Sequence, residues 1–118
     1  MVLHSSSPKA RKEHRCSTCG RVIGVGETYL RQHNVFDGQR YSYLNCEHCL
    51  AFTRRALQLD ANYWDDGINK EALDEAFVYY RQNISDLRLL VMFRRRWRRS
   101  DGTLYPVPTS VGTEMLHR

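Results

Sequence analysis

The sequence predicts a small α+β fold, in which a cysteine-containing module is followed by two further helices and an extended C-terminal tail. Two C-x2-C pairs enclose 26 residues. A strand, turn and strand pattern lies between the pairs, and helical patterns follow the second pair. We expect four segments, namely a flexible basic arm at 1–14, the cysteine module at 15–60, a helical half at 61–100 and the extended tail at 101–118.

The two cysteine pairs predict a metal site, because four thiolates in this spacing can enclose one tetrahedral zinc ion. Such a shell leaves no open position for water or substrate, so the ion would be structural. A redox role would need only one pair, and disulfides are disfavoured in a reducing compartment. His14 and His48 are predicted to be surface side chains. The predicted ligands of one structural Zn²⁺ are Cys16, Cys19, Cys46 and Cys49.

Local patterns place the cysteine pairs on specific elements. Gly20 allows the tight turn of a metal-binding hairpin at the first pair. The runs 28–36 and 40–44 are predicted strands, and Asp37-Gly38 between them is a type I′ turn signal. Asn45 is the predicted cap of a helix that carries the second pair in its first turn. The inner face of that helix should include Phe52, Ala56 and Leu59, with Arg54, Arg55 and Gln58 pointing elsewhere.

A metal hairpin, a β-hairpin and a helix with ligands in its first turn resemble the treble-clef zinc finger, over roughly residues 14–59. The resemblance implies the four cysteines as ligands and implies no particular activity. The pattern C-x2-C-G-x2-I-x2-G-E-x-Y, with the later D-G and C-x2-C, is also similar to small four-cysteine zinc proteins of actinobacterial phages.

An enzymatic function is a remote alternative. Treble clefs also form the core of HNH nucleases, but that family places a histidine directly after the last cysteine. Here Leu50-Ala-Phe follows Cys49, and the sequence offers no other nucleophile and base pair. We therefore expect a protein without catalytic activity.

Two further helices are predicted in the helical half. Asn69 is the expected cap of the first, with Leu73, Ala76, Phe77 and Tyr80 as its apolar stripe. Ser85 is the expected cap of the second, which should end at Asp101-Gly102. The inner face predicted for this second helix consists of Leu87, Leu90, Val91 and Trp97.

Charge is distributed unevenly around a net value of +5. Residues 87–99, which we call the arginine segment, contain six arginines and no acid, whereas residues 60–86 contain seven acidic and two basic side chains. The arginines either bind an external anion or pair with this acidic block, and the sequence leaves both interpretations open. The residues expected to contact nucleic acid or a partner are Arg88, Arg94, Arg95, Arg96, Trp97, Arg98, Arg99, Lys9, Arg11 and Lys12.

Two functional hypotheses follow. In the first, the protein binds nucleic acid, DNA in preference to RNA, through the arginine segment and the basic arm, with a regulatory role. In the second, it is a small phage-type interaction module that docks on a host protein or forms a homodimer. No signal peptide or membrane span is apparent, so we expect a cytoplasmic protein, in the host cytoplasm if a phage encodes it. No membrane or small-molecule partner is expected.

Overall fold

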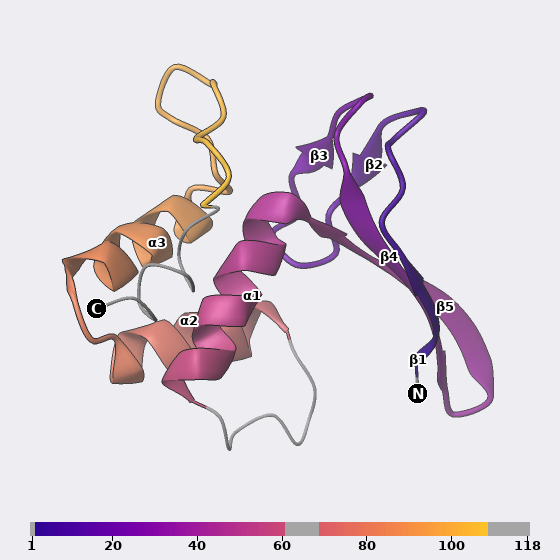
Figure 1. The fold of residues 1–118 in the computed structure, drawn as a ribbon, viewed down its shortest axis with the longest axis horizontal. Coiled ribbons are helices and arrows are strands. Elements are labelled where there is room, and N and C mark those ends of the chain that lie inside the picture. The colour runs from indigo at the N-terminus through magenta and orange to yellow at the C-terminus, as the bar shows by residue number, and fades with distance from the viewer. Residues whose placement is uncertain (1, 61–68, 109–118) are drawn as a thin grey trace. The chain divides into compact units, whose positions relative to one another are not determined.

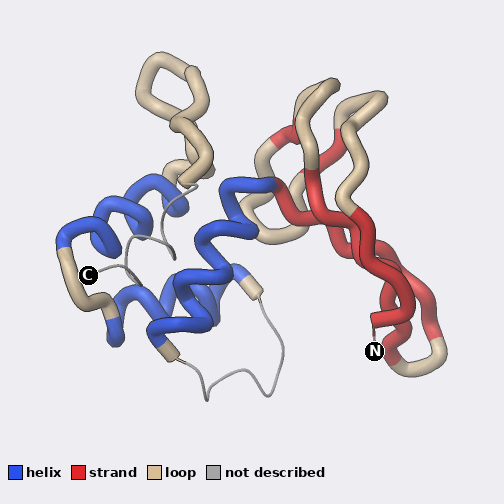
Figure 2. Tube along the Cα trace, viewed as in Figure 1, coloured by secondary structure: helices blue, strands red, loops and turns tan. Residues whose placement is uncertain are grey.

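The computed structural model describes residues 2–60 and 69–108, and it has the predicted α+β fold. Small antiparallel sheets are followed by three helices (Figure 1, Figure 2). The chain divides into two compact units, Met1–Leu50 and Ala51–Arg118, which we call unit 1 and unit 2. None of the helices within the described ranges is long and apolar enough to cross a membrane.

Three antiparallel strands form the larger sheet of unit 1: β1 (Val2–Ser6), β4 (Tyr29–Phe36) and β5 (Gln39–Cys46). Strand β4 lies in the middle (Figure 1). Asp37 and Gly38 have φ angles of 53° and 78°, as the predicted type I′ turn requires. The predicted hairpin is therefore confirmed, although β5 is longer than expected and includes Cys46.

Strand β1 contradicts the prediction of a flexible arm at 1–14. Its backbone pairs with β4, and the chain beyond it stays bound to the start of β4. There Tyr29 N–H donates to the Pro8 carbonyl at 3.1 Å, and Ala10 N–H donates to the Glu27 carbonyl at 2.8 Å. An edge strand can be held by backbone hydrogen bonds alone. The Ser-rich sequence of β1 therefore needs no apolar alternation, and it shows none that could have predicted the strand.

The first cysteine pair lies on a small hairpin made by β2 (His14–Arg15) and β3 (Val22–Ile23). Gly20 in its loop has a φ angle of 82°, the left-handed conformation predicted for this turn. Helix α1 (Glu47–Leu59) starts directly after β5. Cys46, and not the predicted Asn45, takes the cap position, since its sulfur accepts the N–H of Cys49 at 3.4 Å.

Unit 2 contains most of α1, helix α2 (Lys70–Tyr80) and helix α3 (Ile84–Arg94). Asn69 caps α2 as predicted, and its side chain accepts the N–H of Ala72 at 2.8 Å. The cap of α3 is Asn83 and not the predicted Ser85, because the Asn83 side chain accepts the N–H of Asp86 at 2.9 Å.

Helix α3 ends at Arg94, seven residues before the predicted end at Asp101. Arg96 and Trp97 have φ angles of 55° and 64°, so the chain leaves the helix through left-handed backbone. Trp97 N–H donates to the Met92 carbonyl at 2.8 Å and Arg96 N–H to the Phe93 carbonyl at 2.9 Å, the two bonds of a Schellman motif. This helix end was not predicted because glycine, the usual residue at this position, is absent.

Four aromatic side chains form the centre of unit 2. Phe52 of α1 stacks on Phe77 of α2 and on Phe93 of α3, with ring centroids 4.1 and 4.2 Å apart. Trp97 meets Phe52 edge-on at 5.7 Å and is fully buried. The predicted burial of Phe52 and Phe77 is therefore confirmed.

The inner face of α3 is only partly the predicted one. Leu90 is buried as expected, but Leu87 and Val91 are 39% and 47% exposed. Leu89 and Phe93 are buried in their place, on the same side as the acidic residue Asp86. A buried aspartate on the inner face hides the helical period of the apolar residues, which explains the error. The predicted burial of Tyr80 is also wrong, since this side chain at the end of α2 is 51% exposed.

Candidate metal centre

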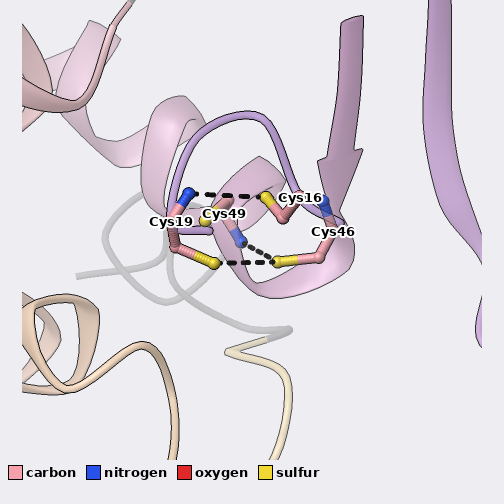
Figure 3. A group of neighbouring side chains, drawn as sticks. All are labelled: Cys16, Cys19, Cys46 and Cys49. Carbon is pink, nitrogen blue, oxygen red and sulfur yellow. Dashed lines mark hydrogen bonds between the residues drawn. The ribbon is translucent and has the colours of Figure 1, made fainter. Parts of the chain in front are cut away.

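The four cysteines lie together in unit 1, and all four are buried. Their sulfur atoms lie within 4.8 Å of one another, and those of Cys19 and Cys46 are 4.0 Å apart (Figure 3). Sulfurs bound to one tetrahedral zinc at about 2.3 Å would be separated by about 3.8 Å. The cluster is thus placed to bind one metal ion, and the donor set fits Zn²⁺.

Backbone N–H groups point at the sulfurs, as a metal-binding hairpin requires. Cys16 Sγ accepts from the N–H of Cys19 at 3.5 Å and from the N–H of Cys46 at 3.4 Å. Cys46 Sγ accepts from the N–H of Cys49. Figure 3 shows this bond and the bond from the N–H of Cys19 to Cys16 Sγ. Such hydrogen bonds stabilise the thiolate form, which is the form that binds metal.

The sulfurs also influence each other's protonation. Hydrogen bonds from Cys19, Cys46 and Cys49 lower the pKa of Cys16. Hydrogen bonds with Cys16 and Cys19 raise the pKa of Cys46 and of Cys49. The pKa of Cys19 is also lowered, so the cluster alone does not favour four thiolates, and a bound cation is needed before all four can ionise.

A buried guanidinium lies next to the cluster. Arg21 is 3% exposed and donates to both carboxylate oxygens of Glu27, at 2.7 and 3.2 Å. Its Nη2 atom lies 3.2 Å from Nδ1 of His48. Burial by itself would lower the pKa of Arg21, but hydrogen bonding to Glu27 and the charge of Cys46 raise it. Arg21 thus places a fixed positive charge beside the thiolates.

The histidines near the cysteines do not lie as predicted. His48 is buried, 4% exposed, whereas a surface position was expected for it. His14 is half-buried, and its Nε2 atom lies 3.3 Å from the hydroxyl of Tyr29. Neither belongs to the four-ligand cluster that the described residues form. Arg21 and Glu27 were not predicted from the sequence, because an ion pair with one buried partner leaves no signature in apolar periodicity.

The arginine segment is largely exposed in unit 2, but its tryptophan is not. Trp97 has no exposed surface, so it cannot make the contact with nucleic acid or a partner that was expected of it. Arg98 is half-buried and donates to the Gly102 carbonyl at 2.9 Å. Arg99 donates to the Leu104 carbonyl at 3.1 Å. The remaining arginines of the segment are all exposed, namely Arg88, Arg94, Arg95 and Arg96.

Pairing between the arginine segment and the acidic block is limited to one exposed pair in the described ranges. Arg94 binds both carboxylate oxygens of Asp74, at 2.8 and 2.9 Å. Among the described residues of unit 2, a second ion pair is buried and joins Asp86 to Arg55, which was predicted to point away from the core. Arg88, Arg95 and Arg99 make no ion pair with a described residue, so the alternative in which the arginines pair with the acidic block holds only for Arg94 in the described ranges.

The predicted basic residues of the N-terminal arm lie in unit 1 between β1 and β2. Lys9, Arg11 and Lys12 are all exposed. They lie around one hollow, together with Arg31 of β4. Two separate groups of exposed cations are thus available, one on each unit.

Comparisons with known proteins add no family to this description. No protein-family model, no curated protein and no solved structure matches the chain. The metal centre is therefore assigned from its sulfur geometry, and the two basic surfaces are assigned from their exposure and charge.

Proposed function

We propose that the protein is a non-enzymatic, nucleic-acid-binding protein whose fold is stabilised by one structural Zn²⁺ ion. We also propose that unit 1, with the start of α1, is a treble-clef-like zinc finger. The order of its elements supports this proposal: a hairpin with the first cysteine pair, the β4–β5 hairpin, and a helix that begins at the second pair. Four thiolates complete the coordination shell, which suits a structural role for the ion.

The exposed arginines of unit 2 are the observation that carries the functional proposal. Arg88, Arg95 and Arg96 are exposed and have no carboxylate partner among the described residues. The negative end of a helix dipole favours a cation near the last turn of α3, but this partial charge does not balance the charges of three arginines. Guanidinium groups bind phosphate through two parallel hydrogen bonds, so a phosphate backbone suits this surface.

The burial of Trp97 narrows the mode of binding that we propose. Without an aromatic platform in the arginine segment, contacts there would be made to phosphates and not to base faces. Binding through phosphates is independent of sequence and falls steeply with salt. Lys9, Arg11 and Lys12 of unit 1 would add further phosphate contacts.

A fluorescence anisotropy titration of a short labelled DNA duplex, repeated over a series of salt concentrations, tests this proposal. The triple variant R88A/R95A/R96A should bind more weakly and should lose roughly 0.9 from the log–log salt slope for each phosphate contact removed. The matched control is R54A/K70A/R81A, which removes three exposed cations of unit 2 outside the segment. Equal losses in the two variants, or no binding by the native protein, would refute the proposal.

The second candidate function, protein–protein interaction, is favoured by an apolar stripe on α3. Ile84, Leu87 and Val91 are 64%, 39% and 47% exposed and share one face of the helix. Such a face suits a second copy of the chain or a host protein. Light scattering after gel filtration separates the two functions. Self-association that V91E abolishes, in a protein that does not bind DNA, would favour the interaction module.

A further inference from the structure

Unit 1 contains an open hollow of about 610 Å³ that the metal centre does not use. We call it the basic hollow, and its polar lining comes from Lys9, Arg11, Lys12, His14, Tyr29 and Arg31. Its volume falls within the range of small-molecule sites, but such sites have mainly apolar walls. Here four lining side chains are cationic and none is acidic, so a matching occupant is an anion.

The positive charge of the basic hollow is not balanced within the described part of the chain. Lys9, Arg11 and Lys12 are exposed and form no ion pair with a described carboxylate. Of the two nearby acids, Glu27 is already paired with Arg21, 2.7 Å away, and Glu13 is one negative charge beside four cations and forms no ion pair with a described residue. Like charges gathered on one surface repel each other and attract anions.

Three side chains form an ordered polar floor for the hollow. Tyr29 is 2% exposed, and its hydroxyl lies between the guanidinium of Arg31, which donates to it, and Nε2 of His14 at 3.3 Å. The Arg31 guanidinium also lies over the Tyr29 ring, 5.4 Å from its centroid. These contacts restrict the rotamers of Arg31, so its charge is already in place when a ligand arrives.

The backbone that carries the lysines is also held in position. Lys9 forms a bridge with Thr28, and Gly26 N–H donates to the Ala10 carbonyl at 2.9 Å. Tyr29 in turn pairs with Cys46 across β4 and β5. The hollow is thus part of the folded sheet, and its shape depends on the same strands that place the metal ligands.

We propose that the basic hollow is a binding site for neighbouring phosphate groups, either a pyrophosphate moiety or consecutive phosphates of a nucleic-acid strand. Two guanidinium groups and two ammonium groups match the several oxygens and charges of such a ligand. The inference deepens the proposed function and rests on it only for the class of ligand. The site needs no contribution from the arginine segment.

Titration of the zinc-loaded, ¹⁵N-labelled full chain with inorganic pyrophosphate, followed by NMR, tests the site. Saturable shifts are expected for the amides of residues 9–14 and 29–31. The variant K9Q/K12Q should bind pyrophosphate roughly 10- to 100-fold more weakly, as expected for the loss of charged hydrogen bonds. The matched control is R40Q/R54Q, which removes two exposed cations that do not line the hollow. A thermal unfolding curve of each variant shows that it is folded.

Each outcome decides for or against the site. Equal weakening in both double variants, or shifts spread over the whole surface, would overturn it. Unchanged pyrophosphate binding by R88A/R95A/R96A supports it, even if that variant no longer binds DNA.

Competition then identifies the source of the phosphates: displacement of pyrophosphate by a DNA oligonucleotide supports a nucleic-acid strand, and displacement only by a nucleoside triphosphate supports a free ligand. Pyrophosphate binding in a protein that binds no DNA would refute the proposed function but would still support the basic hollow as a phosphate-binding site.

Discussion

Arg21 carries a full charge in a buried position beside the cysteine cluster, and three neighbouring groups offset the cost. Glu27 supplies a carboxylate at 2.7 Å, His48 supplies a ring nitrogen at 3.2 Å, and Cys46 supplies negative charge when its sulfur is a thiolate. The buried Nε atom of Arg21 has no nitrogen or oxygen partner among the described residues. Four zinc-bound thiolates carry a net negative charge, so a nearby cation should strengthen metal binding.

We predict that R21M lowers zinc affinity roughly 10- to 100-fold. This is the usual effect of losing a group that lies outside the coordination shell and stabilises the metal ligands. Competition with a chromophoric chelator measures this affinity. The control is R15M, because Arg15 lies on the same hairpin but is exposed. A native zinc affinity in R21M would show that Arg21 only supports the fold.

Removal of the metal should unfold unit 1. The apparent free energy that structural zinc contributes is on the order of 10 kcal/mol, and the small sheets of this unit offer few other buried side chains. We predict one zinc per chain by elemental analysis, and loss of both zinc and β-structure in C49S or after chelation. Because protons compete for the thiolates, acidification should also release the ion. A folded, zinc-free protein would contradict this prediction.

Among the elements, α3 is held to α1 by a buried ion pair. Arg55 binds both oxygens of Asp86, at 2.7 and 2.9 Å, and both side chains are almost fully buried. Burial by itself would raise the pKa of Asp86, but hydrogen bonds from Arg55 and from the Gln82 backbone lower it. Asp86 therefore fixes which face of α3 turns inward.

We predict that D86N destabilises the protein by about 3–5 kcal/mol, because it leaves the Arg55 charge buried without a partner. Since the folded pKa of Asp86 is lowered, its contribution is present above the unfolded pKa of about 3.9 and is lost as the pH falls through the folded value. Urea unfolding at neutral and acidic pH measures both effects. D74N is the control, since its pair with Arg94 is exposed and should contribute far less.

The end of α3 places Trp97 in the core of unit 2. We predict that W97A destabilises the protein by about 3–5 kcal/mol, the cost of truncating a fully buried aromatic side chain. W97F should retain most of the stability and leave DNA affinity unchanged, because the indole has no exposed surface. Thermal unfolding and anisotropy titration measure these two quantities. A specific loss of DNA affinity in the folded W97F variant would restore a direct role for Trp97.

At the scale of the whole molecule, each unit has its own source of stability and its own exposed cations. Unit 1 relies on the cysteine cluster, and unit 2 relies on the aromatic core around Phe52. Arg88, Arg95 and Arg96 are exposed on unit 2, whereas Lys9, Arg11 and Lys12 are exposed on unit 1. A nucleic acid that contacts both surfaces would release counterions at both.

We predict that removing the cations of the two surfaces has additive effects on the salt dependence of DNA binding. Combining K9Q/K12Q with R88A/R95A/R96A should reduce the log–log salt slope for DNA binding by the sum of the two separate reductions, since each phosphate contact contributes about 0.9. The salt series described for the triple variant measures this slope. A combined reduction no greater than that of the triple variant would show that unit 1 does not contact the DNA.

Features with a short-range cause were predictable. Asp37-Gly38 has the backbone preference of its turn, Asn69 has a side chain that accepts a helix N–H, and four spaced cysteines match one metal ion. Each of these depends on neighbours within a few residues or on a donor set that few other sites share. Strand β1 was missed because its partner lies far along the chain and its side chains carry no apolar alternation.

Local chemistry alone was enough to specify the four-cysteine cluster, the β4–β5 hairpin and the existence of the later helices. The burial of charged and aromatic groups depended on contacts between distant segments: Arg21 with Glu27 and the cysteines, Arg55 with Asp86, and Trp97 with Phe52. A charged side chain is buried only when a partner offsets its desolvation, and that partner is chosen by the packing of the whole unit. For the same reason, the number of arginines in residues 87–99 could be read from the sequence. Only the structure showed that Arg94 is paired with Asp74, whereas other arginines of this segment are exposed without an ion pair to a described residue.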